Sequence, residues 1–231
     1  RNIANFPEVI AFRDRIVEKL GVELVVGSVD EAIGTGFIRG PATNNGSRNR
    51  LQTPVLLETI RRGRHTAVLG GARRDEERAR AKERIYSLRD EFGQWDPRNQ
   101  RPELWSLYNG NIDPGQHMRV FPISNWTELD IWRYIAEEGI DLPEVYYAHD
   151  RAVFERDGML MAVSNVMQPA HGEEIVHRTV RFRTVGDMTS TAAVVSEART
   201  PEDVIAETLT TRLSERGATR ADDRTSDAAM E

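Results

Sequence analysis

Residues 70–84 combine a glycine turn with a dense set of cations: GGARRDEERARAKER. The apolar run at residues 66–69 comes directly before them, so we expect a strand there, a tight turn, and a helix opening near Arg73. Arg73 and Arg74 would then lie at a helix N-terminus, where the aligned peptide dipoles disfavour cations. An anion bound at the same place would remove this conflict, because free backbone N–H groups and two guanidinium groups would share it. The pattern predicts a phosphate or sulfate site.

The candidate catalytic residues are therefore Arg73 and Arg74. The other candidate ligands are the turn glycines and the polar residues that follow them, namely Gly70, Gly71, Asp75, Arg78, Lys82 and Arg84. The alternative is a solvated helix, since faces laced with i,i+4 ion pairs are common, and the charges alone favour it. The preceding strand and turn favour a ligand instead, because open α/β sheets bind ligands beyond the carboxyl ends of their strands.

Composition limits the possible functions. The chain has 231 residues, a formal charge of −6 and 39% hydrophobic residues, which is enough for one large or two small domains. Without a global basic excess, we expect no nucleic-acid partner. No apolar run approaches a membrane span and the start does not resemble a signal sequence, so we expect a cytoplasmic protein that binds no membrane.

The metal and redox chemistry open to these residues is narrow. Cysteine is absent, which removes disulfides, thiolate nucleophiles and thiolate metal ligands. The five histidines lack the spacings typical of zinc sites, so we expect no protein-bound metal.

The first part of the chain alternates between helix and strand patterns. Apolar spacing predicts a helix over residues 6–20, followed by a buried strand over 22–26. A loop rich in glycine and asparagine covers 27–52, and a helix follows over 54–62. Together with the strand at 66–69, this order predicts a parallel sheet with helices on both faces.

A proline-broken stretch after residue 93 contains Trp95, Trp105 and Tyr108. Large aromatic side chains are usually buried, so we expect a packed lid over the sheet; a stacking surface for a nucleobase is the alternative. A further strand is expected over residues 119–123.

The next helix has a sequence signature at its start. Thr127 is placed to cap it, with Asp130 at the reciprocal position of a capping box, and Leu129, Trp132 and Ile135 form its inward face.

The pattern changes near residue 145. Asp157-Gly158 predicts a turn, residues 180–184 a strand and residues 200–217 a helix. We therefore expect three parts: a nucleotide- and sulfate-binding α/β domain over 1–145, an α+β extension over 146–217, and a mobile tail over 218–231.

Three segments together are distinctive: LGGARRDEERARAKER at 69–84, WDPRNQRPELWSLYNG at 95–110 and RVFPISNWTELDIW at 119–132. They closely resemble the small subunit of the bacterial heterodimeric sulfate adenylyltransferase. The resemblance implies an adenine-nucleotide α-hydrolase-like fold, also called the ATP pyrophosphatase type, which is shared with phosphoadenylylsulfate reductases.

The resemblance also implies a reaction. A sulfate oxygen attacks the α-phosphorus of ATP, giving adenylylsulfate and pyrophosphate, with Mg accompanying ATP. A large GTPase subunit is the implied partner, and its hydrolysis of GTP drives the synthesis. Such transfer is catalysed chiefly by positioning and charge stabilisation, which agrees with a site made of cations and backbone N–H groups.

One motif of this family is not in the sequence. A phosphate loop of the form Ser-Gly-Gly-Lys-Asp-Ser, and a strand ending in Asp-Thr-Gly, would precede the residues that match Asn5-Phe6. We expect a truncated chain; the alternative is a non-catalytic scaffold or regulatory subunit with a degenerate nucleotide site that binds a GTPase partner. A phosphoadenylylsulfate reductase would need a cysteine thiolate near its C-terminus, and these residues contain none.

Overall fold

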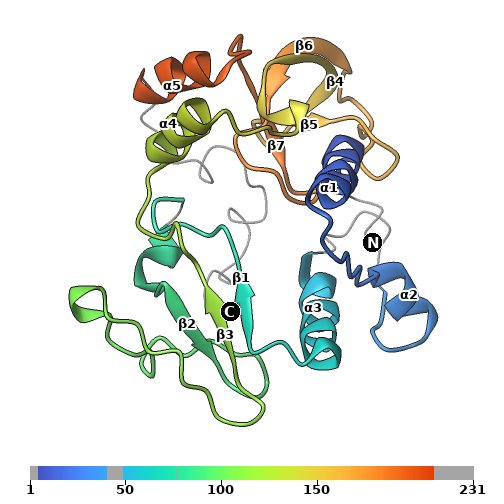
Figure 1. The fold of residues 1–231 in the computed structure, drawn as a ribbon. Coiled ribbons are helices and arrows are strands. Elements are labelled where there is room, and N and C mark those ends of the chain that lie inside the picture. Colours follow the sequence, from blue (N-terminus) through green and yellow to red (C-terminus); the bar gives the residue numbers. More distant parts are fainter. Residues whose placement is uncertain (1–4, 41–48, 77, 211–231) are drawn as a thin grey trace.

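The computed structural model describes residues 5–40, 49–76 and 78–210 (Figure 1). Three helices come before the first sheet: α1 (Pro7–Leu20), α2 (Val29–Gly34) and α3 (Asn49–Gly63). The prediction of a helix over 6–20 is confirmed, and Gly21 ends it in the left-handed conformation at φ 61°. The helix expected over 54–62 is also present and begins earlier.

The expected strand at 22–26 is wrong. These residues form no regular element, pair with none of the described strands and expose their apolar side chains. A strand needs a hydrogen-bonded neighbour, and none of the described strands lies beside this segment. The loop expected over 27–52 also contains α2, which Ser28 caps by accepting from the Glu31 N–H.

A three-stranded sheet lies at the centre of the first part, in the order β1-β3-β2 (Figure 1). Its strands are β1 (Ala67–Leu69), β2 (Tyr86–Arg89) and β3 (His117–Val120). β1 pairs with β3 in parallel, whereas β2 pairs with β3 antiparallel. The α/β class is thus confirmed, but the described sheet is mixed, and the parallel arrangement holds only for β1 and β3.

The helix expected from Arg73 is wrong. A turn covers residues 74–76, and the short 3-10 helix η1 (Arg78–Lys82) leads into β2. The Glu76 carboxylate accepts the Arg73 N–H at 3.1 Å, and residues 86–89 pair with β3. Because tertiary pairing overrides the local helical pattern here, the two arginines do not lie in the first turn of an α-helix.

The aromatic stretch only partly forms the expected lid. Trp95 is half-buried beneath the Arg89 guanidinium, and Tyr108 stacks on Tyr86 with ring centroids 5.0 Å apart. Trp105, in the 3-10 helix η2 (Leu104–Ser106), is 87% exposed and has a positive φ of 52°, so packing is the wrong expectation for it.

A closed antiparallel barrel forms most of the second part, in the order β4-β5-β7-β6. Its strands are β4 (His149–Arg156), β5 (Met159–Ala162), β6 (Val176–Arg181) and β7 (Ala192–Val195). The turn predicted at Asp157-Gly158 joins β4 to β5, with φ of 52° and 73° at its two residues. Both values are positive, as a tight hairpin turn requires.

The helix α4 (Glu128–Glu138) and the 3-10 helix η3 (Glu144–Tyr146) connect the sheet to the barrel, and α5 (Pro201–Thr210) follows the barrel. Trp132 and Ile135 of α4 pack with Ala198 and Val204, which confirms part of the predicted inward face. The capping box of Thr127 and Asp130 is also present. The expected helix over 200–217 is confirmed as far as Thr210, and its remainder lies outside the described residues, as does the expected tail.

The apolar core crosses the predicted boundary at residue 145. Phe6, just before α1, joins Val145, Val153, Val180 and Phe182 in one buried cluster. Figure 1 shows α1 beside the barrel, although the two are far apart in sequence. The division into 1–145 and 146–217 stays a prediction. None of the described helices is both long and apolar enough to cross a membrane.

Candidate anion-binding site

Arg74 lies in a polar hollow of about 230 Å³ that begins just after the carboxyl end of β1. Its Nε donates to the Glu83 carbonyl at 2.8 Å, and its Nη1 donates to Asn125 Oδ1 at 2.6 Å. These acceptors fix the plane of the guanidinium. An arginine held this way keeps its charge and presents its remaining donors in a defined direction.

Arg84 lines the same hollow. Its Nε is buried and has no hydrogen-bond partner within the described protein. The one carboxylate in the lining, Glu103, is 3.7 Å from Arg74 Nη2 and also accepts the N–H groups of Ile85 and Tyr86. Two guanidinium groups beside one engaged carboxylate make the hollow electropositive, which suits an oxyanion.

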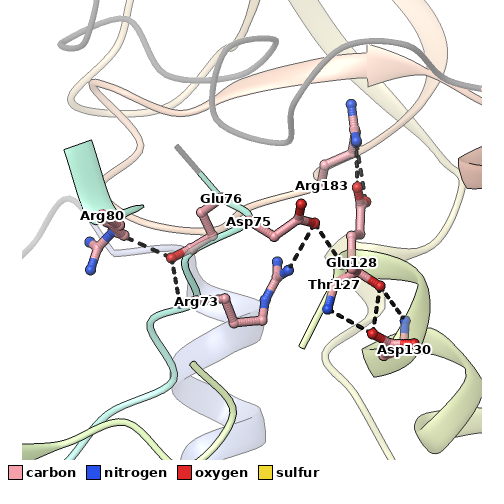
Figure 2. Close-up of polar contacts among 8 residues, drawn as sticks. All are labelled: Arg73, Asp75, Glu76, Arg80, Thr127, Glu128, Asp130 and Arg183. Carbon is pink, nitrogen blue, oxygen red and sulfur yellow. Dashed lines mark hydrogen bonds and ion pairs between the residues drawn. The ribbon is translucent and has the colours of Figure 1, made fainter. Parts of the chain in front are cut away.

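Arg73 points away from this hollow, so the predicted arginine pair diverges. Its side chain is buried and lines a second hollow of about 260 Å³, together with Gly71, Trp132 and Arg183. Its Nη1 is 3.7 Å from Asp75 Oδ2 (Figure 2). Adjacent residues project in different directions, as they would also have done on the expected helix.

Asp75 connects the arginine segment to α4. Its Oδ2 accepts the Glu128 N–H at 3.0 Å, at the first turn of the helix. The Glu128 carboxylate in turn holds Arg183 in a buried ion pair, with Nη2 at 2.5 Å and Nε at 3.2 Å (Figure 2). Arg183 comes from the segment after β6, and nothing in its sequence neighbourhood predicted that it would join the Arg73 hollow.

The remaining candidates separate clearly. Gly70 donates its N–H to the Val120 carbonyl, and a Cβ there would lie 2.9 Å from the Phe121 ring, so the position requires glycine. Lys82 is exposed. The side chain of Arg78 lies outside the described part of the chain. The structure thus groups Arg74 with Arg84, and Arg73 with Gly71.

Comparison with known proteins gives these residues a context. The family model described as the phosphoadenosine phosphosulfate reductase domain matches residues 2–193. A "Sulfate adenylyltransferase subunit 2" of Mycobacterium sp. (strain JLS) is 63% identical over 98% of this chain and 72% of its own length. Proteins of the same name from Streptomyces lavendulae and Mycobacterium tuberculosis (strain ATCC 25177 / H37Ra) are 61% and 59% identical, covering 70% and 72% of their lengths. The chain belongs to the sulfate adenylyltransferase subunit 2 family.

Membership of the sulfate adenylyltransferase subunit 2 family confirms the resemblance found in the three sequence segments. The phrase "subunit 2" in the names of the relatives implies that those proteins work with a partner subunit.

A second set of cationic residues, which lies on the sheet, was not identified from the sequence. Arg89 and His117 are cross-strand neighbours of β2 and β3, and Ser87 is the neighbour of Arg119. Because side chains alternate along a strand, these four residues share one face of the sheet. Single cations at alternate positions of short strands form no recognisable sequence motif. Only the pairing of β2 with β3 shows that these residues are neighbours.

Burial lowers the pKa of these cations. Desolvation is the largest cause for Arg89, whose pKa falls to about 10, and the charge of Arg119 adds to it. Desolvation also lowers the pKa of His117, followed by the charges of Arg119 and Arg89. The pKa of Arg119 is lowered by burial as well. The three side chains therefore repel one another in a poorly solvated place.

No cluster of three or more histidine, aspartate or glutamate side chains in the described residues could hold a metal ion.

Proposed function

We propose that the chain is the sulfate-adenylylating subunit of a sulfate adenylyltransferase. A sulfate oxygen would attack the α-phosphorus of ATP, the bond between the α- and β-phosphates would break, and adenylylsulfate and pyrophosphate would leave. The observation that carries this proposal is the 59–63% identity over 98% of the chain to relatives of that name. The electropositive hollow of Arg74 and Arg84 supplies matching chemistry.

In this proposal the arginines act by charge and position. Arg74, held by Glu83 and Asn125, would bind an oxygen of sulfate or phosphate, and Arg84 would offer its buried Nε to the same anion. Sulfate is a weak nucleophile, so holding both anions in line is the main task of the site. Arg73 and Asp75 would serve as positioning residues, because Asp75 contacts both Arg73 and the first turn of α4.

Further parts of the proposal concern what lies outside this chain. The partner would be a large GTPase subunit that drives the equilibrium by GTP hydrolysis. Mg would arrive bound to the phosphates of ATP, because magnesium is commonly held by one or two carboxylates together with substrate phosphates. The cytoplasm is the proposed location, since ATP and GTP are available there. The mixed sheet would belong to an adenine-nucleotide α-hydrolase-like sheet with helices on both faces.

The test is pyrophosphate release by the chain together with the partner subunit. One version would carry these 231 residues, and another would be extended to the full length of the relatives. We expect the extended version to release pyrophosphate only when sulfate, ATP and GTP are all present. If the extended version binds the partner but shows no dependence on sulfate, the proposal is wrong and a scaffold role replaces it.

A further inference from the structure

Arg89, His117 and Arg119 form a cluster on one sheet face, which we call the sheet-face cluster. Arg89 and His117 are each only 5% exposed, and Arg119 is half-buried. Cross-strand partners have Cβ atoms about 5 Å apart, so the Arg89 and His117 side chains leave the sheet as neighbours. The proposed catalytic reaction uses none of these residues.

Both carboxylates and a further arginine lie near the cluster. Glu83 is 3.4 Å from Arg89 Nη2 and also accepts the Ser87 hydroxyl. Arg80, whose charge further lowers the pKa of Arg89 and Arg119, is 3.4 Å from Glu76. Asp90 is a third carboxylate near the cluster, and its charge raises the pKa of His117. The pKa values of Arg89 and Arg119 are nevertheless lowered by burial and by neighbouring guanidinium groups, so an anion bound between them would stabilise their charged forms.

Donor atoms of the cluster are also left over. Arg89 Nη1, His117 Nε2 and Arg119 Nε are buried and have no hydrogen-bond partner within the described protein. Trp95 Nε1 is also buried without a hydrogen-bond partner within the described protein, and the Trp95 ring lies 5.8 Å from the Arg89 guanidinium carbon. Buried polar atoms in folded proteins nearly always have partners, so four exceptions in one neighbourhood need an explanation.

The cluster can be reached from outside. His117 lines an open hollow of about 500 Å³ between the sheet and α3. Arg64 and His65 stand at this hollow, as do the carboxylates of Glu58 and Glu91 and the guanidinium of Arg61, which pairs with Glu58. An anion could therefore enter beside His117.

We propose that Arg89, His117 and Arg119 form a second oxyanion site, which takes a tetrahedral dianion such as sulfate or a phosphate group. Guanidinium donors match oxyanions of this geometry, and a protonated imidazole adds a further charged donor. His117 lies at the start of β3, while Gly70 and Arg74 follow the carboxyl end of β1. Along β3, His117 lies three residues, about 10 Å, before the level of Leu69, and Arg119 lies one residue before it. None of Arg89, His117 and Arg119 lines the Arg74 hollow, so the two sites are distinct.

The test follows the ring signals of the five histidines by NMR, with His117 assigned from a His117→Asn variant. The full chain is titrated with sodium sulfate at constant ionic strength, using chloride as the reference salt. We expect the His117 signal to shift saturably and its pKa to rise, because a bound anion stabilises the imidazolium against Arg89, Arg119 and burial. Sulfate affinity should consequently increase as the pH falls.

Two variants make the result specific. Arg119→Met removes the charge but fills the space, so it should weaken sulfate binding at least ten-fold without lowering stability in chloride. Arg119→Lys keeps a charge and remains informative if the first variant fails to fold; it should weaken binding less. Arg156→Gln is the matched control, because Arg156 pairs with Glu173 on the barrel, and it should leave the His117 response unchanged.

Two further titrations, with inorganic phosphate and with ATP, identify the source of the anion. A shift of His117 with either sulfate or phosphate supports an inorganic oxyanion site, and a shift with ATP alone supports a nucleotide phosphate. If none of the three moves the His117 signal, or if Arg119→Met responds like the unmodified chain, the proposal is wrong. Because this experiment measures no turnover, a negative result would not count against the proposed adenylylation. A failure of the adenylylation assay would likewise not count against the second oxyanion site.

Discussion

Arg73 and Arg74 are adjacent and of one type, yet their environments assign them different tasks. Arg74 sits in a polar hollow with Asn125, whereas Arg73 is buried toward Asp75 and α4. The sequence predicted an anion site here because a strand and a glycine turn precede the cations, and that site stays a prediction. It could not predict the divergence, because that depends on a turn stabilised by the Glu76 carboxylate and on contacts from residues 103 and 125.

At this scale we predict that Arg74→Lys slows adenylylation roughly 10²- to 10³-fold. The ammonium keeps the charge, but it cannot donate at once to the Glu83 carbonyl, to Asn125 and to an anion in a fixed plane. The measurement is the sulfate-dependent release of pyrophosphate by the full-length complex. Arg62→Lys, in an exposed pair with Glu58, is the matched control and should keep its rate. Equal rates for the two variants would show that Arg74 has only a structural role.

Among the elements, α4 was the most predictable, because its local signals agree with its packing. Thr127 accepts the Asp130 N–H, the Asp130 carboxylate accepts the Thr127 N–H, and Trp132 and Ile135 lie on the buried face. The Thr127 N–H, which has the largest effect, and the Thr127 hydroxyl both donate to the Asp130 carboxylate and lower its pKa below the usual value. Consistent signals of this kind let a short sequence specify one structure.

We expect Thr127→Ala to lower the free energy of unfolding by about 1 kcal/mol, within a range of about 0.5 to 2, since it removes the cap acceptor. Chemical denaturation followed by circular dichroism measures the change. Arg133→Ala, on the exposed face of α4, should change stability little. A Thr127→Ala variant as stable as the parent would show that packing against α5, rather than the cap, fixes the start of the helix.

Other elements could not be predicted because distant partners decide them. Residues 22–26 have the composition of a strand, but a strand exists only where another strand pairs with it. The segment after Arg73 has helical spacing, yet its end pairs with β3 as β2. Of the barrel, the sequence predicted only one turn and a strand at 180–184, of which residues 180 and 181 alone lie in β6. The rest could not be predicted, because closure depends on β4 and β6 pairing across 20 or more residues. The sheet-face cluster depends on the same long-range register.

For the whole molecule, the question is whether the sheet and the barrel unfold together. Phe6 joins the barrel core from the start of the chain, and α4 joins α5 through a second cluster. The Arg183–Glu128–Asp75 contacts add a polar connection between the loop after β6 and the arginine segment (Figure 2). These three connections favour one cooperative unit, despite the change of sequence character near residue 145.

Phe6→Ala tests this cooperativity. Phe6 is 1% exposed and meets the Phe182 ring edge-on at 4.8 Å, so the variant should lose about 3–5 kcal/mol of stability. For a chain of this length, that loss corresponds to a fall in Tm of roughly 6–20 °C.

All four tryptophans lie between residues 95 and 132, outside the barrel, and report on the sheet and α4. In one cooperative unit, tryptophan fluorescence and far-UV circular dichroism shift together, while Phe92→Ala, at a 69% exposed ring, shifts neither. A tryptophan transition that stays in place while the circular dichroism splits into two steps would show instead that the barrel unfolds by itself, because losing the Phe6 contact would then weaken only the barrel.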